Sequence, residues 1–442
     1  MTAEPAFWRS GPVNDGPSTA AKLALTEVIF TFKKWLYMED PGVVLVVLAS
    51  FAANRIASDP LWLMLVGASS GGKTETLNAI SKLPDVYLAA TMTEASLLSG
   101  TPKRERDGSA HGGLLRELGA FGVVVLKDFG SILSMDRNAR ASLMAALREL
   151  YDGSWTRYVG TDGGRTLQWE GKLGLIAGCT TAIDSHHAVM ATLGERFLLF
   201  RLPLFDRRAF GGRALDNTGS EVAMRAELSA VVRRLFDSLV IPDTLPVLSA
   251  QDRDRLVSLA SLISMARSAV ERDGHTREIE LVHDTEAPAR LVQALRRLYA
   301  GLLIIGVEQP EAWRLVVKAG LDCMPKIRRT VFDLLAATKA PVTTPTIATA
   351  TDYPTQTARR ALEDLAAHKV TQRSKDGNSD LWQLSDEARS LLAEATVPEM
   401  WEDLTNPKTL VSNFSGTRPC VYCGLPVEGG DVHEDCEAEA AR

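Results

Sequence analysis

The sequence predicts an α/β protein: a parallel-sheet core with a helical lid, then a small domain of helices and a hairpin, then a metal-binding tail. Three observations predict this fold class. Apolar runs at residues 61–66, 121–126 and 173–177 have the length and continuity of buried parallel strands. Residues 326–384 read as three helices followed by a hairpin. Residues 420–436 contain two close pairs of cysteine and histidine.

The length and composition indicate a soluble protein with several domains. A chain of 442 residues exceeds one ordinary core and predicts two or three domains. Its longest apolar stretch, residues 43–53, has about half of the ~20 residues that a membrane span needs. A net charge of −6 argues against wholesale coating of nucleic acid and still permits a local basic surface. We therefore expect a cytoplasmic protein with no export signal and no membrane partner.

Composition shifts divide the chain into five predicted segments. Residues 1–20 carry prolines and glycines without apolar periodicity, which predicts a flexible lead-in. Helical periodicity at residues 21–37 and a proline-started helix at residues 41–56 open the core. The predicted domains are the α/β core at 21–205, the helical lid at 206–320, the C-terminal domain at 321–397, and a linker with the metal-binding tail at 398–442.

The first apolar run leads into a loop that matches G-x-x-x-x-G-K-[ST] at every fixed position, and a predicted helix follows. The glycines let the backbone approach phosphate oxygens, Lys73 reaches the β- and γ-phosphates, and Thr74 offers a hydroxyl to Mg²⁺. A chance lysine after a glycine-rich turn is the alternative, and the strand and helix in register argue against it. The sequence thus predicts binding of ATP with Mg²⁺, through Gly67, Ala68, Ser69, Ser70, Gly71, Gly72, Lys73, Thr74 and Glu75.

The second apolar run ends in Asp128, where a Walker B strand would hold Mg²⁺ or its water. Such a strand usually ends in two adjacent carboxylates, and here there is only one. If Lys127 and Asp128 align with that pair, Asp128 is catalytic and a lysine takes the metal position. If Asp128 holds the metal, Phe129 replaces the base. Either alignment predicts slow hydrolysis or assistance from another group.

A helix at residues 135–151 and a hairpin at residues 154–170 follow this strand. The hairpin arginines, Arg157 and Arg165, either contact nucleic-acid phosphates or only solvate an exposed hairpin. A polar loop with alternating charges at residues 103–107 is a solvated surface loop or reaches a substrate. The third apolar run ends in a small polar residue, Thr180.

In this order, the motifs resemble the AAA+ ATPases, and a hairpin before the third run is similar to their pre-sensor-1 hairpin branch. That branch includes minichromosome-maintenance helicases and superfamily 3 helicases of viruses and plasmids. The resemblance covers about residues 40–301, and the loop motif is its specific part. It implies that Thr180, or Thr181, is sensor 1, which helps to place the attacking water.

The resemblance also implies two arginine roles. Arg196, in Gly-Glu-Arg-Phe, looks like the arginine finger that reaches a neighbouring subunit's γ-phosphate, with Arg201 as the fallback. An ordinary surface salt bridge is the alternative for Arg196. Arg290 resembles sensor 2 at a helix start facing the nucleotide. A finger that acts in trans implies a homo-oligomer, most often a hexameric ring.

Three helices and a hairpin at residues 326–384 look like a winged helix. This stretch has more basic than acidic residues, although the whole chain is acidic. Polar and basic side chains on its third helix suit phosphate and base-edge contacts in a major groove. A protein-binding module is the alternative. The candidate DNA-contacting residues are Thr355, Gln356, Thr357, Arg359 and Arg360.

The C-terminal tail contains C-x₂-C followed by H-x₂-C, with a glycine-rich turn between the pairs. Three thiolates and one imidazole suit a tetrahedral Zn²⁺ without an open position, which predicts a structural knuckle. Acidic residues around it favour a protein partner over nucleic acid. The candidate ligands are Cys420, Cys423, His433 and Cys436.

Together these features predict an ATP-hydrolysing AAA+ protein that acts on DNA, such as a replication initiator or helicase of a phage, plasmid or integrative element. Two alternatives remain. One is a nucleotide-gated DNA-binding switch or helicase loader that unwinds nothing, which the single Walker B carboxylate favours. The other is an anti-phage defence ATPase whose winged helix and knuckle recruit proteins.

Overall fold

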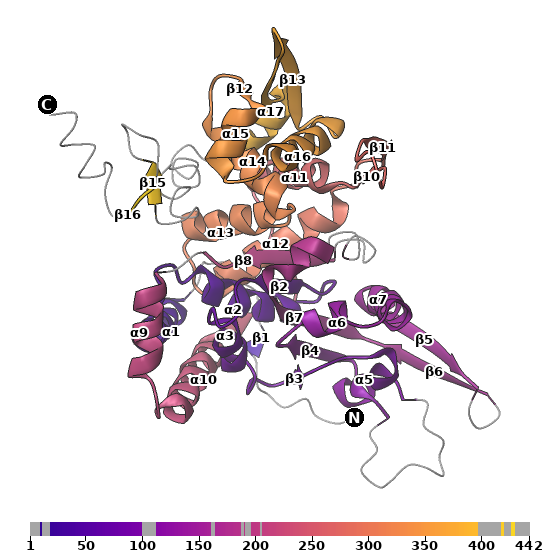
Figure 1. Cartoon of the computed structure of the whole chain (residues 1–442). Coiled ribbons are helices and arrows are strands. Elements are labelled where there is room, and N and C mark those ends of the chain that lie inside the picture. Colours follow the sequence, from indigo (N-terminus) through magenta and orange to yellow (C-terminus); the bar gives the residue numbers. More distant parts are fainter. Residues whose placement is uncertain are drawn as a thin grey trace, which may run out of the picture. The chain divides into compact units, whose positions relative to one another are not determined.

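The computed structural model describes residues 9–10, 18–99, 112–160, 164–186, 190, 196–203, 206–396, 417–419 and 426–428. The chain forms two compact units. The first contains residues 1–269 and 283–325, and the second contains residues 270–282 and 326–442. The boundary at residues 325 and 326 lies close to the predicted start of the C-terminal domain at residue 321. Helices and a parallel sheet make up the first unit, so the α/β class is confirmed (Figure 1).

A five-stranded sheet forms the centre of the first unit. All of its neighbouring strands are parallel, and their order is β3-β4-β7-β2-β8. The three apolar runs are β2, β4 and β7, which lie next to one another and are almost completely buried, as predicted. The strands are β2 (Trp62–Val66), β3 (Val86–Ala89), β4 (Phe121–Leu126), β7 (Lys172–Cys179) and β8 (Phe197–Arg201).

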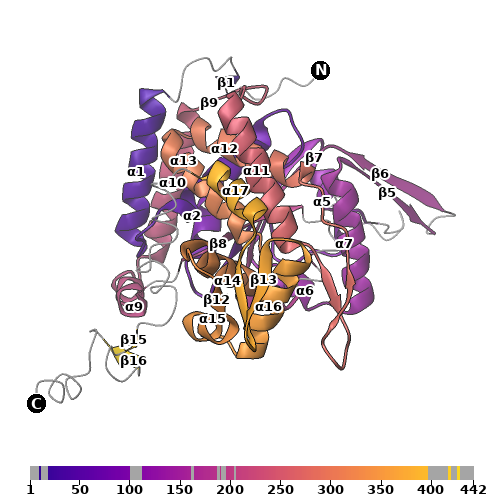
Figure 2. The same cartoon turned by 90° about the horizontal axis from the view of Figure 1, so that it is seen from above.

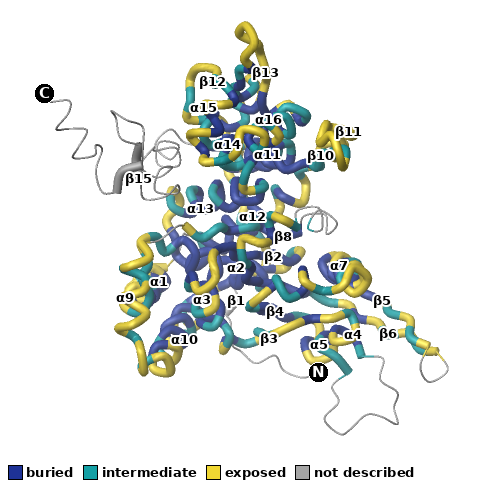
Figure 3. Tube along the Cα trace, viewed as in Figure 1, coloured by how far each residue is buried: buried dark blue, intermediate teal, exposed yellow. Residues whose placement is uncertain are grey.

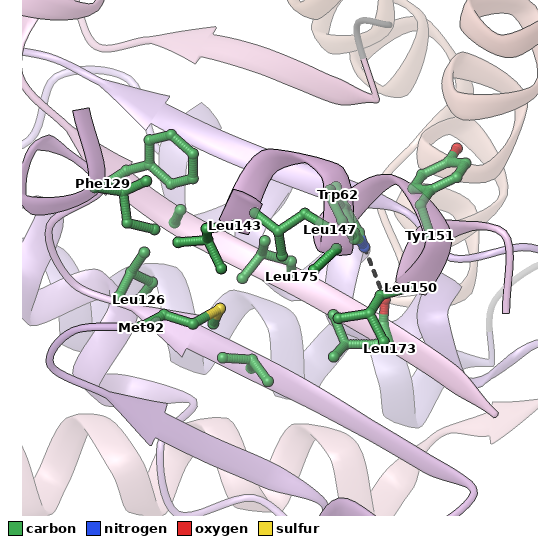
Figure 4. Packing of buried hydrophobic residues seen from close by; sticks show 14 of the residues in the cluster. Trp62, Met92, Leu126, Phe129, Leu143, Leu147, Leu150, Tyr151, Leu173 and Leu175 are labelled. Carbon is green, nitrogen blue, oxygen red and sulfur yellow. Dashed lines mark hydrogen bonds between the residues drawn. The ribbon is translucent and has the colours of Figure 1, made fainter. Parts of the chain in front are cut away.

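Helices cover both faces of this sheet. On one face, α2 (Gly42–Arg55) is buried along its whole length and α3 (Lys73–Ala79) lies against β7. On the other face, α7 (Arg137–Tyr151) packs leucines onto alternate residues of the strands (Figure 4). The Trp62 indole lies in this core and donates a hydrogen bond of 2.7 Å to the carbonyl of Leu173. Short elements complete this side: α4 (Glu94–Leu97), α5 (Leu114–Leu118), α6 (Gly130–Leu133) and the 3-10 helix η3 (Thr181–His186).

The predicted hairpin is present as an arm that projects from the first unit, formed by β5 (Ser154–Val159) and β6 (Arg165–Glu170) (Figure 1). At its base, Trp155 faces Trp169 across the strands and both are buried. Further out the arm is exposed, and Tyr158 is 80% exposed (Figure 3). The base therefore anchors the arm, whereas its outer part offers side chains to solvent.

The remaining elements of the first unit are mostly helical, and α1 runs beside α10 (Figure 2). Helix α13 covers the free edge of β8: the Leu199 amide donates to Cys323 Sγ, and the Arg201 amide donates to the Asp322 carboxylate. These elements are α1 (Thr19–Trp35), α9 (Arg207–Asp216), α10 (Glu221–Ser238), α11 (Ala250–Arg267), α12 (Ala289–Ile304) and α13 (Gln309–Asp322), with the parallel pair β1 (Arg9–Ser10) and β9 (Val240–Ile241).

The second unit has the predicted order of three helices and a hairpin. Its small sheet has the order β12-β14-β13, and the Trp382 indole at its centre donates to the Thr344 hydroxyl. The elements are α14 (Lys326–Ala337), β12 (Val342–Thr343), α15 (Thr344–Thr351), α16 (Thr355–Ala367), β13 (Thr371–Asp376), β14 (Ser379–Leu384) and α17 (Asp386–Ala395). Two short strands, β15 (Thr417–Pro419) and β16 (Pro426–Glu428), pair further along the chain.

A hairpin interrupts the segment at residues 206–320 that the sequence predicted to be a helical lid. Strands β10 (Val270–Arg272) and β11 (Ile279–Val282) lie between α11 and α12 in sequence but belong to the second unit. Arg272 holds this hairpin on α16 through hydrogen bonds to Asp364 Oδ1 at 2.7 and 3.1 Å and to Glu363 Oε2 at 3.1 Å. These partners are about ninety residues away in sequence, so no local pattern indicated them.

Candidate nucleotide-binding site

The G-x-x-x-x-G-K-[ST] loop connects the carboxyl end of β2 to the start of α3. Ala68, Ser69 and Ser70 are exposed at its tip. Gly72 directly precedes the helix with φ of +83°, a left-handed conformation that glycine adopts without strain. This conformation lets α3 begin at Lys73.

Lys73 lies against its own loop. Its Nζ donates to the carbonyl oxygens of Gly67 at 2.8 Å and Ala68 at 2.6 Å. Burial lowers the pKa of Lys73, and the nearby Cys179 and Asp128 side chains oppose this effect. The ammonium thus lies close enough to Asp128 for their charges to interact, at the position where the loop would receive phosphates.

The sheet topology brings the predicted site residues to one place. Because β2, β4 and β7 are parallel neighbours, the residues that follow them meet at the carboxyl end of the sheet. The Gly67 amide donates to the carbonyl of Cys179 at 3.2 Å, which ties the loop to β7. Thr180 follows directly and is half-buried, whereas Thr181 is exposed. Lys73, Asp128 and Thr180 therefore share one end of the sheet.

Asp128 has a carboxylate oxygen available for a ligand. Oδ1 accepts a hydrogen bond of 2.8 Å from the Gly130 amide, and Oδ2 bonds to no atom within the described residues. Asp128 and Thr74 are both exposed, and a carboxylate with a hydroxyl is a donor set that suits Mg²⁺. Phe129 is buried in the core with its ring 5.5 Å from that of Phe197. It is a packing residue and offers no base.

An arginine that the sequence did not indicate lies beside the loop helix. Arg225 of α10 forms an ion pair with Glu75, the residue after Thr74, at 2.7 Å. The two residues are 150 positions apart, and α10 gives no local signal beyond helical periodicity. The resemblance had implied Arg290, as sensor 2, for an arginine that faces the nucleotide.

Arg196, the predicted arginine finger, is at the opposite end of the sheet from its own loop. Phe197 pairs in register with Trp62, the first residue of β2, so Arg196 lies at the amino end. Its side chain is 4% exposed and bonds to Asp152 Oδ2 at 2.8 Å. The guanidinium cannot reach its own loop from there, and a role in trans requires it to leave Asp152.

Arg201, the fallback finger, is at the carboxyl end, in register with Val66. Its guanidinium forms two hydrogen bonds with Asp184, at 2.7 and 2.9 Å. Arg196, Arg201 and Arg267 line one pocket along β8. Both finger candidates are therefore held within their own subunit in this structure.

Arg290 is exposed at the second position of α12. Seven residues later, Arg297 bonds to Asp59, which precedes β2 at the amino end of the sheet. Further along α12, Gly301 lies against Ala49 in the middle of α2. At 1.5 Å per residue, Arg290 is about 10 Å beyond Arg297, on the side away from the loop. It does not face the G-x-x-x-x-G-K-[ST] loop of its own chain.

The arm arginines are only partly available to a ligand. Arg157 donates to Glu94 Oε1 at 3.0 Å and to the carbonyl of Leu98 at 2.5 Å, so it is turned onto the first unit. Arg165 is half-buried. Residues 103–107, the predicted charged loop, lie outside the described residues.

The candidate DNA-contacting residues lie on α16, as predicted. Thr355, Gln356 and Arg360 are exposed, and Thr357 is half-buried. Arg359 bonds to Asp380 Oδ2 at 2.6 Å. Asp380 also accepts from Arg373 of β13, and hydrogen bonds from Arg373 and then Arg359 hold the pKa of Asp380 below its usual value. Two of the basic side chains are thus fixed by one carboxylate between α16 and the hairpin.

The predicted zinc ligands, Cys420, Cys423, His433 and Cys436, lie outside the described residues. Among the side chains that the structure describes, no cluster of three or more histidine, cysteine, aspartate or glutamate residues could hold a metal ion. No helix of the described part is long and apolar enough to cross a membrane.

Comparison with known proteins gives little. No family model and no curated protein matches the chain. An A-form apo structure of the NrS-1 C-terminal region is similar over 87% of this chain and 79% of that chain, with 11% identity and a TM-score of 0.24. A second structure of the same region covers 86% and 78%, with 10% identity and a TM-score of 0.24.

Proposed function

We propose that this protein is an AAA+ ATPase that binds and hydrolyses ATP at residues 67–74 and acts on DNA. One observation carries the proposal. The loop motif, Asp128 and Thr180 follow three adjacent parallel strands, and the charge of Asp128 influences the buried Lys73. A lysine, a carboxylate and a hydroxyl beside a glycine-rich loop are the groups that phosphoryl transfer needs.

In this proposal each side chain has a defined task. Lys73 leaves the carbonyls of Gly67 and Ala68 and binds phosphate oxygens, which are stronger acceptors for an ammonium. Asp128 Oδ2 and the Thr74 hydroxyl would hold Mg²⁺, which would supply positive charge to neutralise the phosphates. Thr180 orients the attacking water. With Phe129 in the core, no second carboxylate follows Asp128, and we expect slow hydrolysis.

The second unit would supply DNA contact as a winged helix. Its helices and its three-stranded sheet, with the exposed strand β13 at one edge, support this proposal, and α16 would enter the major groove. Gln356 and Arg360 are exposed on α16, and Lys375 is exposed on the hairpin. We propose that these side chains contact DNA, whereas Arg359 and Arg373 fix the hairpin through Asp380. The tail would carry a zinc knuckle that recruits a protein partner.

Oligomerisation would complete the ATP site. Arg196 is at the opposite end of the sheet from its own loop, as a residue that serves a neighbouring copy would be. In a ring of identical subunits, a γ-phosphate of the neighbour would replace Asp152 as its partner. Because Asp152 is 55% exposed, water can solvate its carboxylate when Arg196 leaves.

Steady-state ATP hydrolysis, with and without single- and double-stranded DNA, tests this function. Lys73→Ala should abolish turnover while DNA binding by the protein persists. Asp152→Asn should leave turnover intact, whereas Arg196→Ala should lower it, with folding monitored by circular dichroism. Unchanged turnover in Lys73→Ala would overturn the ATPase assignment. If DNA stimulates ATP hydrolysis and Arg196→Ala removes this stimulation, the protein is an oligomeric motor.

A second candidate is a nucleotide-gated DNA-binding switch or loader, and the buried Phe129 after Asp128 favours it. Such a protein binds ATP tightly, turns it over slowly and changes its DNA affinity without strand displacement. A strand-displacement assay separates the two functions. Three results together would instead favour the defence ATPase. They are ATP turnover that DNA does not stimulate, no strand displacement, and no ATP-dependent change in DNA affinity.

A further inference from the structure

An ion pair connects α10 with the helix that follows the nucleotide loop. Arg225 donates through Nη2 to Glu75 Oε1 at 2.7 Å and through Nε to both Glu75 oxygens at 3.0 and 3.2 Å. Glu75 directly follows Thr74, the predicted Mg²⁺ ligand. The guanidinium therefore contacts the residue that directly follows the loop that we propose to hold the phosphates.

The two partners differ in their freedom to move. The Glu75 side chain is 19% exposed and belongs to the first turn of α3, whereas the Arg225 side chain is 51% exposed. The Arg225 Nη1 bonds to no atom of the described residues, so it remains available as a donor. Arg225, the more exposed partner, can thus turn about its side-chain bonds, whereas Glu75 stays in place on α3.

Electrostatics gives this pair a consequence for ligand binding. The Glu75 carboxylate next to the loop would repel a triphosphate, and Arg225 neutralises it in this structure. A triphosphate carries more negative charge than one carboxylate and offers several acceptors to a guanidinium. A bound nucleotide is therefore a better partner for Arg225 than Glu75 is.

The other arginines that we considered do not compete for this role. Arg196 is at the amino end of the sheet, and Arg290 lies beyond that end on α12. Arg201 is at the carboxyl end, but two hydrogen bonds hold it on Asp184. Arg225 combines a position beside the loop with a half-exposed side chain.

We propose that Arg225 contacts the phosphates of bound nucleotide, and that Glu75 holds it beside the loop until nucleotide arrives. This inference rests on the proposed ATP site and adds a phosphate-contacting residue from α10. It also gives α10 a means to respond to the nucleotide, because Arg225 changes partner when the site fills.

Equilibrium binding of the fluorescent analogue mant-ATP to four proteins tests the proposal: the wild type, Arg225→Ala, Glu75→Gln and the double variant. Arg225→Ala should weaken binding by about fivefold, since a charge-assisted contact at a solvent-screened site is lost. Glu75→Gln should tighten binding, because it removes a repelling charge and frees the arginine. In the Glu75→Gln background, Arg225→Ala should weaken binding at least as much as in the wild type.

The double variant discriminates between two roles of Arg225. If Arg225 only neutralises Glu75, its removal has no effect once residue 75 is uncharged, and the proposal is overturned. Arg225→Lys should restore part of the affinity, as expected for a positive charge that reaches phosphate.

A matched control is available on the same helix. Arg234 forms an exposed ion pair with Glu27, far from the loop, so Arg234→Ala should leave mant-ATP affinity unchanged. If Arg234→Ala weakens mant-ATP binding as much as Arg225→Ala does, then loss of any ion pair on α10 affects the site, and the specific role of Arg225 is overturned.

Wild-type protein that fails to bind mant-ATP would overturn the proposed function together with this inference. If the wild type binds mant-ATP, and Lys73→Ala abolishes this binding while Arg225→Ala leaves it unchanged, the inference is overturned but the proposed function is not.

Discussion

The two ends of the central sheet use charged residues in opposite ways. At the carboxyl end, around the loop, Thr74 and Asp128 are exposed, and within the described residues Lys73 bonds only to loop carbonyls. At the amino end, Arg196 and Arg297 are buried and their carboxylate partners are exposed. There Arg297 is 4% exposed in its side chain, whereas its partner Asp59 is 66% exposed.

This difference indicates different tasks. Exposed groups with open hydrogen-bonding positions can receive a ligand without disturbing the core, so their loss affects chemistry. Buried guanidiniums that bond to carboxylates and neighbouring side chains are part of the packing, so their loss affects stability. The difference predicts that variants at the carboxyl end impair turnover and that variants at the amino end lower the free energy of unfolding. Arg196→Ala should in addition lower turnover, because we propose that Arg196 serves the ATP site of a neighbouring copy.

The largest effect is expected for Asp128→Asn at the carboxyl end. The amide keeps the hydrogen bond from Gly130 but loses the charge for Mg²⁺, so kcat for ATP should fall about a hundredfold. Because Asp128 is exposed, the thermal unfolding midpoint should stay unchanged. Steady-state hydrolysis and a thermal melt of the same sample check both parts. Lowered stability with normal turnover would remove the distinction between the two ends.

Local sequence patterns predicted most of the first unit's sheet and the second unit. Asp136 illustrates why: its carboxylate accepts from the amides of Asn138 and Ala139, so the start of α7 is determined within four residues. The loop motif is equally local, because its strand, glycines and helix are contiguous. The order of helices and hairpin in the second unit followed from the same kind of signal.

Long-range pairs could not be predicted in this way. The partners of Arg225, Arg196 and Arg272 lie 44 to 150 residues away, and only the tertiary topology brings them together. The sequence therefore indicated which arginines exist but not which end of the sheet each one occupies. Arg290 is an example: the sequence predicted that it lies at a helix start, but not that this helix start lies on the side away from the loop.

A smaller effect is expected for Arg297→Ala at the amino end. This guanidinium bonds to Asp59 and Gln293 at 2.6 and 2.8 Å while being almost completely buried. Its removal should cost about 2 kcal/mol of unfolding free energy, moderated by the exposure of Asp59. Arg290→Ala on the same helix is the control, and its exposed side chain should change stability by less than about 0.5 kcal/mol. Urea unfolding measures both, and equal values would show that burial at this end has no energetic role.

The smallest effect concerns Lys172, the first residue of β7, whose Nζ donates to the carbonyl of Ile56. Burial, and then the nearby Arg297, lower the pKa of Lys172 to about 8. The unfolded chain, with its ordinary lysine pKa, then binds more protons than the folded protein above pH 8, so stability should rise with pH. Relative to Lys172→Met, the wild type should gain about 1 kcal/mol between pH 8 and 9. Other groups titrate alike in both proteins. If the unfolding free energies of the two proteins, measured with urea, change in parallel with pH, then water solvates this ammonium and its pKa is not lowered.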